Sequence, residues 1–357
     1  MSPEERNPAA GSDLEAARVE KLLDEALQAT FPASDPIAIH PRSAAGHGVW
    51  PDLPYPAWRE TCATLHLWTQ VVGKVRNAKT PWLNQSWHVP LYVSARGLTT
   101  SLIPDARSPF EIEFDFLQHR LAITTVAGAR GEIALEPRSV ADFYAAVMAK
   151  LGELGIAVAI SELPCEIPEA IPFSRDHSHA AYDADYAQRF WRLLVQVERV
   201  FKQFRTRFIG KGSPVHFFWG SFDLAVTRFS GRPAPLHPGG VPGLADAIVR
   251  EAYSHEVSSA GFWPGGAGFE QASFYCYAYP EPPGFKTSTV APEGAFYSET
   301  LHEFLLPYEV VRTAADPDEA LLAFLQSSYE AAAVAGDWDR AALECASGRP
   351  GVPRPIG

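Results

Sequence analysis

The apolar residues of this chain recur with two different periods, and the order in which these periods follow one another constrains the fold most. A period of three to four residues, which predicts a helix, covers four stretches: 57–77, 139–155, 184–209 and 316–336. Alternating or β-branched residues, which predict strands, fill six others: 86–103, 110–116, 120–126, 214–223, 252–263 and 272–279. Helices therefore bracket strands twice, which predicts an α+β protein of two similar halves, each an antiparallel sheet flanked by helices.

The two halves can also be aligned with each other. TQVVGKVR (69–76) can be laid on VQVERVFK (195–202), with three matched positions in a helical stretch. HVPLYVSARGLT, which begins at His88, can be laid on HFFWGSFDLAVT, which begins at His216. This alignment predicts an internal duplication with a pseudo-twofold relation between the halves.

Linker composition and proline positions suggest where the halves begin and end. Proline and glycine interrupt the chain between residues 30 and 48, directly after a short amphipathic pattern at 13–28. The predicted divisions are a flexible N-terminal arm at 1–48, a first half at 49–172, a second half at 173–345 and a disordered tail at 346–357.

Composition limits the classes of partner. The chain has 357 residues and a formal net charge of −12 at pH 7, which disfavours nucleic acid and anionic membranes as partners. No apolar run reaches the roughly 18 residues needed to cross a bilayer, and the N-terminal sequence lacks a signal-peptide pattern. The four cysteines form no CxxC pair. We therefore expect a cytoplasmic protein that binds a small-molecule ligand.

The stretch PVHFFWGSFD (214–223) resembles a buried strand, yet it contains His216, Ser221 and Asp223. Alternate residues of a strand face opposite sides, so His216 and Asp223 cannot meet, and a Ser-His-Asp triad is excluded unless a bulge intervenes. A buried histidine without a hydrogen-bond partner costs about 1–3 kcal/mol. His216 is therefore expected either to have a structural partner or to belong to a site.

Further histidines suggest chemistry. AYSHEVSSAGFWPGG (252–266) places His255 beside Glu256, although adjacent residues of a regular strand face opposite sides. RDHSHAAYD places His177 and His179 on one side of an extended segment, where they could hold a divalent metal or could simply belong to a capped loop. We assign His216, His255 and Glu256 as catalytic candidates, and His88, His177 and His179 as candidate metal ligands.

Aromatic residues near these positions predict the wall of a pocket between the halves. We assign ligand or cofactor contacts to Trp87, Trp219, Trp263, Tyr275 and Arg192. Arg192 lies in the basic stretch of the 184–209 helix, where it could bind an anionic group or pair with the acidic surface.

Five stretches together resemble a bacterial family known only as a domain of unknown function: WPDLPYPAW, LHLWTQVVGKVR, SWHVPLYVSARGLTTS, SPVHFFWGSFDLAVTRFSGRP and REAYSHEVSSAGFWPGG. The resemblance covers roughly residues 50–345 and implies no activity. Separately, DEALQATFPASDP (24–36) resembles an N-terminal segment of assorted small bacterial proteins.

These observations together predict a small-molecule-binding protein. In the first hypothesis it is a metal-assisted, hydrolase-like enzyme that uses the histidines and Glu256. In the alternative, it is a ligand-binding or protein-interaction module without catalysis, and the histidines have structural roles.

Overall fold

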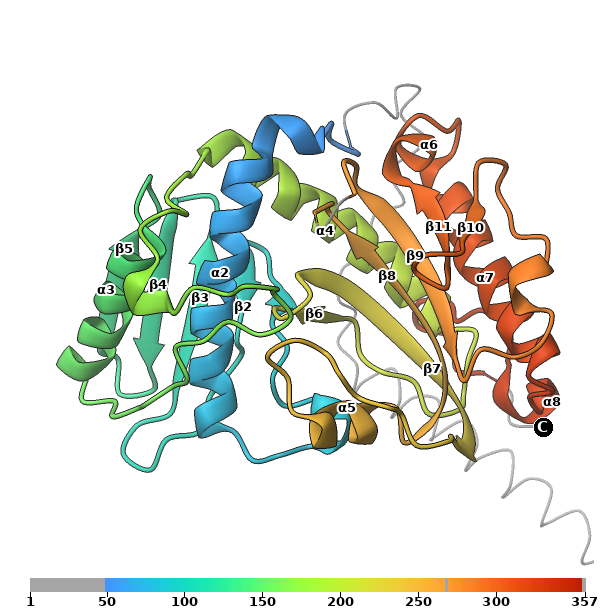
Figure 1. The fold of residues 1–357 in the computed structure, drawn as a ribbon, viewed down its shortest axis with the longest axis horizontal. Helices are drawn as coiled ribbons and strands as arrows, with labels where there is room; N and C mark the ends of the chain where they lie inside the picture. The colour runs from blue at the N-terminus through green and yellow to red at the C-terminus, as the bar shows by residue number, and fades with distance from the viewer. Residues whose placement is uncertain (1–48, 267–268, 355–357) are drawn as a thin grey trace, which may run out of the picture. The chain divides into compact units, whose positions relative to one another are not determined.

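Figure 1 shows a computed structural model of the chain, which describes residues 49–266 and 269–354. Internal contacts group the described residues up to Ser347 into one compact unit. The predicted arm at 1–48, with its helix at 13–28, lies outside the described residues, as do residues 355–357 of the predicted tail.

The large unit contains α-helices, short 3-10 helices and antiparallel strands. The helices are α2 (Tyr55–Lys79), η2 (Asn84–Ser86), α3 (Val140–Glu153), η3 (Phe173–Arg175), α4 (Ala184–Arg205), α5 (Asp246–Ala252), η4 (Phe285–Thr287), α6 (Tyr308–Arg312), α7 (Pro317–Ala335) and α8 (Arg340–Leu343). The strands are β1 (Tyr92–Val93), β2 (Gly97–Thr99), β3 (Phe110–Asp115), β4 (Arg120–Thr125), β5 (Arg130–Ala134), β6 (His216–Phe218), β7 (Asp223–Pro233), β8 (His255–Trp263), β9 (Ser273–Tyr279), β10 (Phe296–Ser298) and β11 (Glu303–Pro307).

The first sheet is an antiparallel meander in the order β1-β2-β3-β4-β5. Its core residues alternate along the strands, so that Ile112 of β3 pairs with Ile123 of β4. Helices α2 and α3 pack together beside this sheet (Figure 1). Trp68 of α2 stacks on Phe143 of α3 with ring centroids 4.5 Å apart. This packing buries the apolar stripe that the sequence predicts for each helix.

The second sheet has the order β10-β11-β9-β8-β7-β6, and all its neighbouring strands are antiparallel. Helix α4 contacts β7, and helix α7 contacts β8 and β9. On that side Arg228 of β7 lies over the rings of Phe204 and Tyr329, which belong to these two helices. Alternate residues of β7 therefore face the helices, and the intervening residues face the opposite side of the sheet.

Backbone hydrogen bonds join the two sheets within the large unit. Leu91, just before β1, exchanges two hydrogen bonds of 2.9 Å with Phe217 of β6. Trp191 of α4 also donates its indole N–H to the carbonyl of Ser94, at 3.0 Å. These contacts fix the first sheet and its helices against the edge of the second sheet.

The structure confirms the α+β class and the four predicted helices. Ser139, Asp183 and Asp316 cap α3, α4 and α7 by accepting backbone N–H bonds. The prediction of one continuous strand over 214–223 was wrong, because residues 219–222 form the turn between β6 and β7. Helix α5, which falls in a segment rich in glycine and proline, was not predicted.

The structure does not confirm the predicted duplication. The first sheet has five strands in sequence order, whereas the second has six, and β11 lies between β9 and β10. The alignment of the two halves also places β1 opposite the turn at 219–222 rather than opposite a strand. His88 lies in a turn, while His216 opens β6, so the aligned histidines occupy different structures.

Candidate functional site

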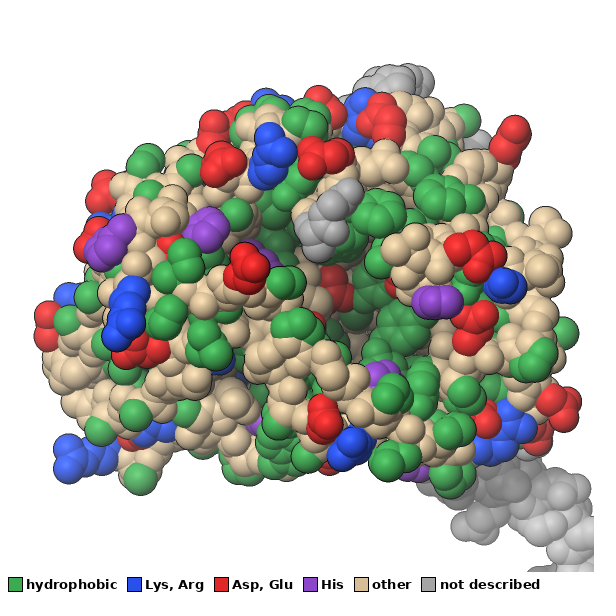
Figure 2. All heavy atoms as spheres, in the orientation of Figure 1, with side chains coloured by type: hydrophobic (Ala, Val, Ile, Leu, Met, Phe, Trp, Pro, Cys, Tyr) green, Lys and Arg blue, Asp and Glu red, His purple; other side chains and the backbone are tan. Residues whose placement is uncertain are grey.

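A cavity of about 570 Å³ lies against the face of the second sheet that points away from α4 and α7. Figure 2 shows this face hollowed near its centre, with acidic side chains in the depth and hydrophobic side chains around them. The floor consists of alternate residues of neighbouring strands: Asp223, Ala225, Thr227 and Phe229 of β7, Val257, Ser259 and Trp263 of β8, Tyr275 and Tyr277 of β9, and Glu303 of β11.

Three segments from other parts of the chain cover this floor. They are the turns around η2, the Cys165–Glu166 pair, and α5 with the loop before it. A hydrogen bond of 2.6 Å from the indole N–H of Trp82 to Glu251 connects the η2 region to α5. The cavity wall thus contains residues of both sequence halves.

Asp223 lies at one end of the cavity and is only 6% exposed. The hydroxyls of Ser221 and Tyr275 each donate a hydrogen bond to its carboxylate. Tyr275 reaches Asp223 by crossing β8 at Gly261, where any side chain would collide with the tyrosine ring. Glycine at position 261 therefore makes this contact between β9 and β7 possible.

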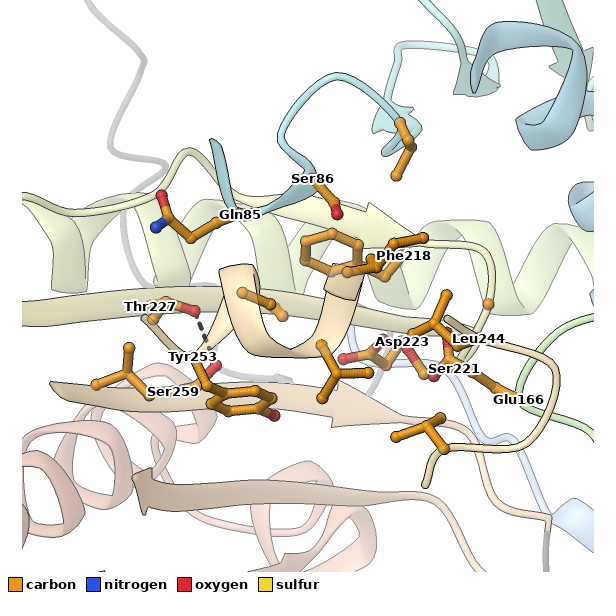
Figure 3. A pocket seen from close by; sticks show the side chains of 18 of the residues that line it. Gln85, Ser86, Glu166, Phe218, Ser221, Asp223, Thr227, Leu244, Tyr253 and Ser259 are labelled. Atoms are coloured by element: carbon orange, nitrogen blue, oxygen red, sulfur yellow. Dashed lines mark hydrogen bonds between the residues drawn. The ribbon is translucent and has the colours of Figure 1, made fainter. Parts of the chain in front are cut away.

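Glu166 lies beside Asp223 at the same end (Figure 3). The buried amide of Gln70 in α2 holds this segment, because it donates to the carbonyl of Cys165 and accepts from its N–H, both at 2.9 Å. Glu166 itself has φ 60°, a left-handed conformation that is uncommon for a residue with a side chain. Gly220 leaves room for its carboxylate, since a β-carbon there would overlap that carboxylate.

Glu303 provides the third carboxyl of the wall, at the start of β11. The residue before it, His302, has φ 57°, and Phe222 before Asp223 has φ 59°. Glu303 also lies at the junction with a neighbouring groove that includes His237, Tyr253 and Tyr277. Each of the three acids therefore has a left-handed backbone conformation or directly follows a residue that has one.

Burial perturbs all three carboxyls. It raises the pKa of Asp223 to about 6, although the Ser221 and Tyr275 hydrogen bonds oppose the shift. Burial, followed by the charge of Asp223, raises the pKa of Glu166 and of Glu303 to about 7. The three carboxyls are thus only partly ionised near neutral pH, as interacting acids in a site of low polarity are.

The opposite end of the cavity is lined by hydroxyls and an amide, and Glu303 lies in the same cross-strand row, beside Tyr277. Thr227 and Ser259 share a hydroxyl hydrogen bond of 2.8 Å, which is drawn in Figure 3. The hydroxyls of Tyr253 and Tyr277 lie 2.9 Å apart. Gln85 completes this end and accepts a hydrogen bond of 2.7 Å from Lys211, which is not part of the wall.

Comparison with known families adds one finding. The model of a family of unknown function, DUF5996, matches residues 50–345. The chain belongs to the DUF5996 family. The matched span contains all the residues that line the cavity, and it confirms the resemblance seen in the sequence. No curated protein and no solved structure gives a significant match.

In this DUF5996 member, four of the predicted contact residues lie on the cavity wall: Trp87, Trp219, Trp263 and Tyr275. The indole N–H of Trp219 donates to the carbonyl of Val89 at 2.8 Å, which orients its ring. Arg192 is exposed on α4 and is not a wall residue, so the structure separates it from the other four.

The three predicted catalytic residues do not lie on the wall of this cavity. His216 is fully buried among the rings of Trp87, Tyr92 and Phe218. Glu256 forms an ion pair with Arg232 at 2.7 Å. His255 of β8 pairs with Pro233 of β7. His216 of β6 pairs with Ala225, which lies eight residues before Pro233 in β7. The structure therefore does not bring His216 together with His255 and Glu256.

The His216 ring has an unusual environment. Neither of its nitrogens has a hydrogen-bond partner among the residues that the structure describes. Burial, together with the nearby charges of Arg76 and Arg205, lowers its pKa to about 3. The ring is therefore neutral at physiological pH.

The predicted metal ligands are also separated. His88 lies 3.0 Å from the Asn77 side chain, whereas His179 pairs with Asp176 at 2.7 Å. His177 lies 3.4 Å from Ser139, at the start of α3. Across residues 49–266 and 269–354, no group of three or more His, Cys, Asp or Glu side chains is arranged to hold a metal ion. The predicted metal ligands therefore form no metal-binding cluster among the described residues.

None of the three carboxyls was among the site residues assigned from the sequence, although Asp223 was considered as a further metal ligand. Asp223 was noticed but assigned to the wrong strand, because the turn at 219–222 was not recognised. The available signal was the alternation of Asp223, Ala225, Thr227 and Phe229 at the start of β7. Glu166 and Glu303 follow no periodic pattern that would have identified them.

Proposed function

We propose that this protein binds a small organic molecule in the cavity against the second sheet. The observation that carries the proposal is the cavity of about 570 Å³, which has the carboxyls of Asp223 and Glu166 at one end of a largely apolar wall. Ligand sites in proteins usually have such volumes and such a composition, with a few polar groups that orient the ligand.

The wall supports this function through its arrangement. Rings of Trp87, Trp219, Trp263 and Phe229 provide broad apolar contact area. Ser221 and Tyr275 donate to Asp223, while Gln70 fixes the backbone next to Glu166. Side chains held in this way remain in place before a ligand arrives, which reduces the entropic cost of binding.

Two tryptophan substitutions in α5 test the proposal. Ala252 lines the cavity, whereas Ala247 is exposed on the same helix and is not a wall residue. Ala252→Trp should fill the space, and Ala247→Trp is the matched control. We expect ligand-observed NMR with a mixed panel of anionic, neutral and cationic aromatic fragments to detect binding to the parent protein and to Ala247→Trp. Ala252→Trp should lose it. Equal fragment binding by both variants would contradict a ligand site here.

The raised carboxyl pKa values favour a second candidate, acid–base catalysis of hydrolysis. A carboxyl with a pKa of about 7, such as Glu166, can donate or accept a proton at neutral pH. A panel of nitrophenyl esters and glycosides provides the test, with Glu166→Gln and Asp223→Asn as variants. If the parent protein turns over one of these substrates and both variants do so at least a hundredfold more slowly, catalysis is supported. Turnover that they leave unchanged would refute it.

A further inference from the structure

The charges on the cavity wall have one sign. Its charged side chains are the carboxyls of Glu166, Asp223 and Glu303, and the described part of the wall includes no Lys, Arg or His. Asp223 has two hydroxyl donors. No hydrogen bond or ion pair involves the carboxylates of Glu166 and Glu303 among the residues described. Asp223 and Glu166 therefore form an acidic end without a counter-charge on the wall, and Glu303 adds a third negative charge farther along the wall, beside Tyr277.

The spacing of these acids is suited to a group larger than a metal ion. The described residues contain no metal-binding cluster, so the three carboxyls border the space rather than converge on one point. Each comes from a different segment: the Cys165–Glu166 pair, β7 and β11. Figure 3 shows Glu166 and Asp223 together near Ser221, away from Gln85 and Thr227.

The aromatic wall complements a positive charge as well. The ring faces of Trp and Tyr attract cations, and this attraction strengthens where water is excluded. Trp219, Trp263, Tyr253 and Tyr277 line the same cavity as the carboxyls. The protein already uses this interaction elsewhere, because Arg228 lies 3.5 Å from the centre of the Phe204 ring. An anionic ligand would instead meet the repulsion of three acids.

We infer that the ligand of this cavity is an organic cation, in which an ammonium or amidinium group lies against Asp223 and Glu166 and an apolar body lies on the aromatic wall. The inference rests on the proposed function and specifies the class of ligand. An ammonium group has three N–H donors, which suit several carboxylates at once. The neutral hydroxyls of Thr227 and Ser259, at the other end, would contact the far part of the molecule.

Binding of a cation should release protons. Burial raises the pKa of Asp223 to about 6, and burial with the charge of Asp223 raises the pKa of Glu166 and Glu303 to about 7, so the carboxyls hold part of their protons at neutral pH. A cation favours the ionised carboxylates, so affinity should rise between pH 5 and pH 8, over which a primary amine stays protonated. Other titratable groups lie close to them. Burial raises the pKa of Cys165 to about 11 and also raises the pKa values of Tyr253, Tyr275 and Tyr277, whereas it lowers the pKa of His66, which bonds Gly220, to about 4. Lys74 lies near Cys165, and His237 and His302 line the groove that contains Glu303.

Three matched series of probes test the class of ligand. The first contains phenylalkylamines with one to four methylene groups, and the other two contain the alcohols and the carboxylates of the same lengths. Binding to the full-length protein is measured by ligand-observed NMR and by calorimetry in two buffers that differ in ionisation enthalpy. We expect the best amine to bind at least about tenfold more tightly than its alcohol, with proton release, and the carboxylates not to bind.

Variants connect the preference to the carboxyls. Asp223→Asn should lower amine affinity about tenfold or more and leave alcohol affinity unchanged, and Glu166→Gln should lower amine affinity several-fold. Glu256→Gln, which alters an acid that is not on the wall, is the control.

The outcomes separate this inference from the proposed function. If the alcohols bind as tightly as the amines, and Ala252→Trp abolishes their binding, the inference is overturned while the proposal of a small-molecule site stands. Amine binding that Asp223→Asn and Glu166→Gln do not weaken would also overturn it. If no probe binds the parent protein in a manner sensitive to Ala252→Trp, both fail. A circular dichroism spectrum of each variant shows whether it has folded.

Discussion

The free energy of unfolding of Asp223→Asn, compared with that of the parent protein at the same pH, should increase as the pH rises. The pKa of this buried carboxyl is about 6 in the folded protein, compared with an ordinary value of 3.8. As the pH rises between these values, the unfolded chain loses the proton while the folded protein retains it. The free energy of unfolding of the parent therefore falls across this window, and asparagine, which does not titrate, removes that loss.

The magnitude follows from the width of the window. Each pH unit between the two pKa values corresponds to about 1.36 kcal/mol, so the full effect approaches roughly 3 kcal/mol. About 2 kcal/mol of it falls between pH 4.5 and pH 8, and structural relaxation around the site reduces this to about 1–2 kcal/mol. The weaker hydrogen bond from Tyr275 to an amide should cost about 1 kcal/mol, equally at both pH values.

Urea unfolding at pH 4.5 and pH 8, followed by tryptophan fluorescence, measures this difference. Asp115→Asn is a matched control, because Asp115 is buried but bound by Arg96 and Arg120. Burial alone would raise the pKa of Asp115, yet hydrogen bonds from Arg96 and the backbone outweigh it and lower the pKa. Asp115→Asn should therefore destabilise by a similar amount at both pH values, about 1–3 kcal/mol. If the stability of Asp223→Asn relative to the parent does not increase with pH, the reasoning about this site is wrong.

Three further substitutions test the supports of the site and the buried histidine. Gln70→Ala should lower the free energy of unfolding by about 2–3 kcal/mol and speed amide exchange at Cys165, because the buried N–H and carbonyl of Cys165 lose their bonds to the Gln70 amide; unchanged exchange would contradict this role. His216→Phe should leave thermal stability unchanged or raise it by about 1–3 kcal/mol, since the ring nitrogens have no partner among the described residues, and a clear loss would reveal one. Gly261→Ala should destabilise by about 1–3 kcal/mol through its collision with Tyr275, whereas an unaltered melting temperature would exclude that contact.

The elements with strong periodicity were predictable from sequence. Trp68, Phe143 and the apolar residues around them repeat every three or four positions, and this spacing identified α2 and α3 before any contact was known. Strands β3, β4 and β9 followed from alternation in the same way. Tertiary contacts rather than local pattern determine α5, because its seven residues begin after a loop of glycine and proline and Trp82 binds it from a distant segment.

The site was harder to predict, because its residues come from distant and irregular parts of the chain. The aromatic wall could be identified, since Trp87, Trp219 and Trp263 stand out within short strand-like stretches. The histidines attracted attention because polar residues in strands are unusual. The structure places His216 inside a cluster of rings, while Glu166, in a segment without periodicity, reaches the cavity. The periodicity of apolar residues in the sequence indicates which residues are buried, but it does not indicate which of them line the same cavity.

The backbone around the carboxyls gives a further reason to regard the cavity as functional. Glu166, Phe222 and His302 have φ values of 60°, 59° and 57°, and each is one of the three acids or directly precedes one. A left-handed conformation costs a residue with a side chain roughly 1–2 kcal/mol, and such residues concentrate at binding and active sites. The raised carboxyl pKa values represent a second cost at the same place. A cation bound there would relieve the electrostatic part of this cost only in the folded state, so it should raise the melting temperature as its concentration increases.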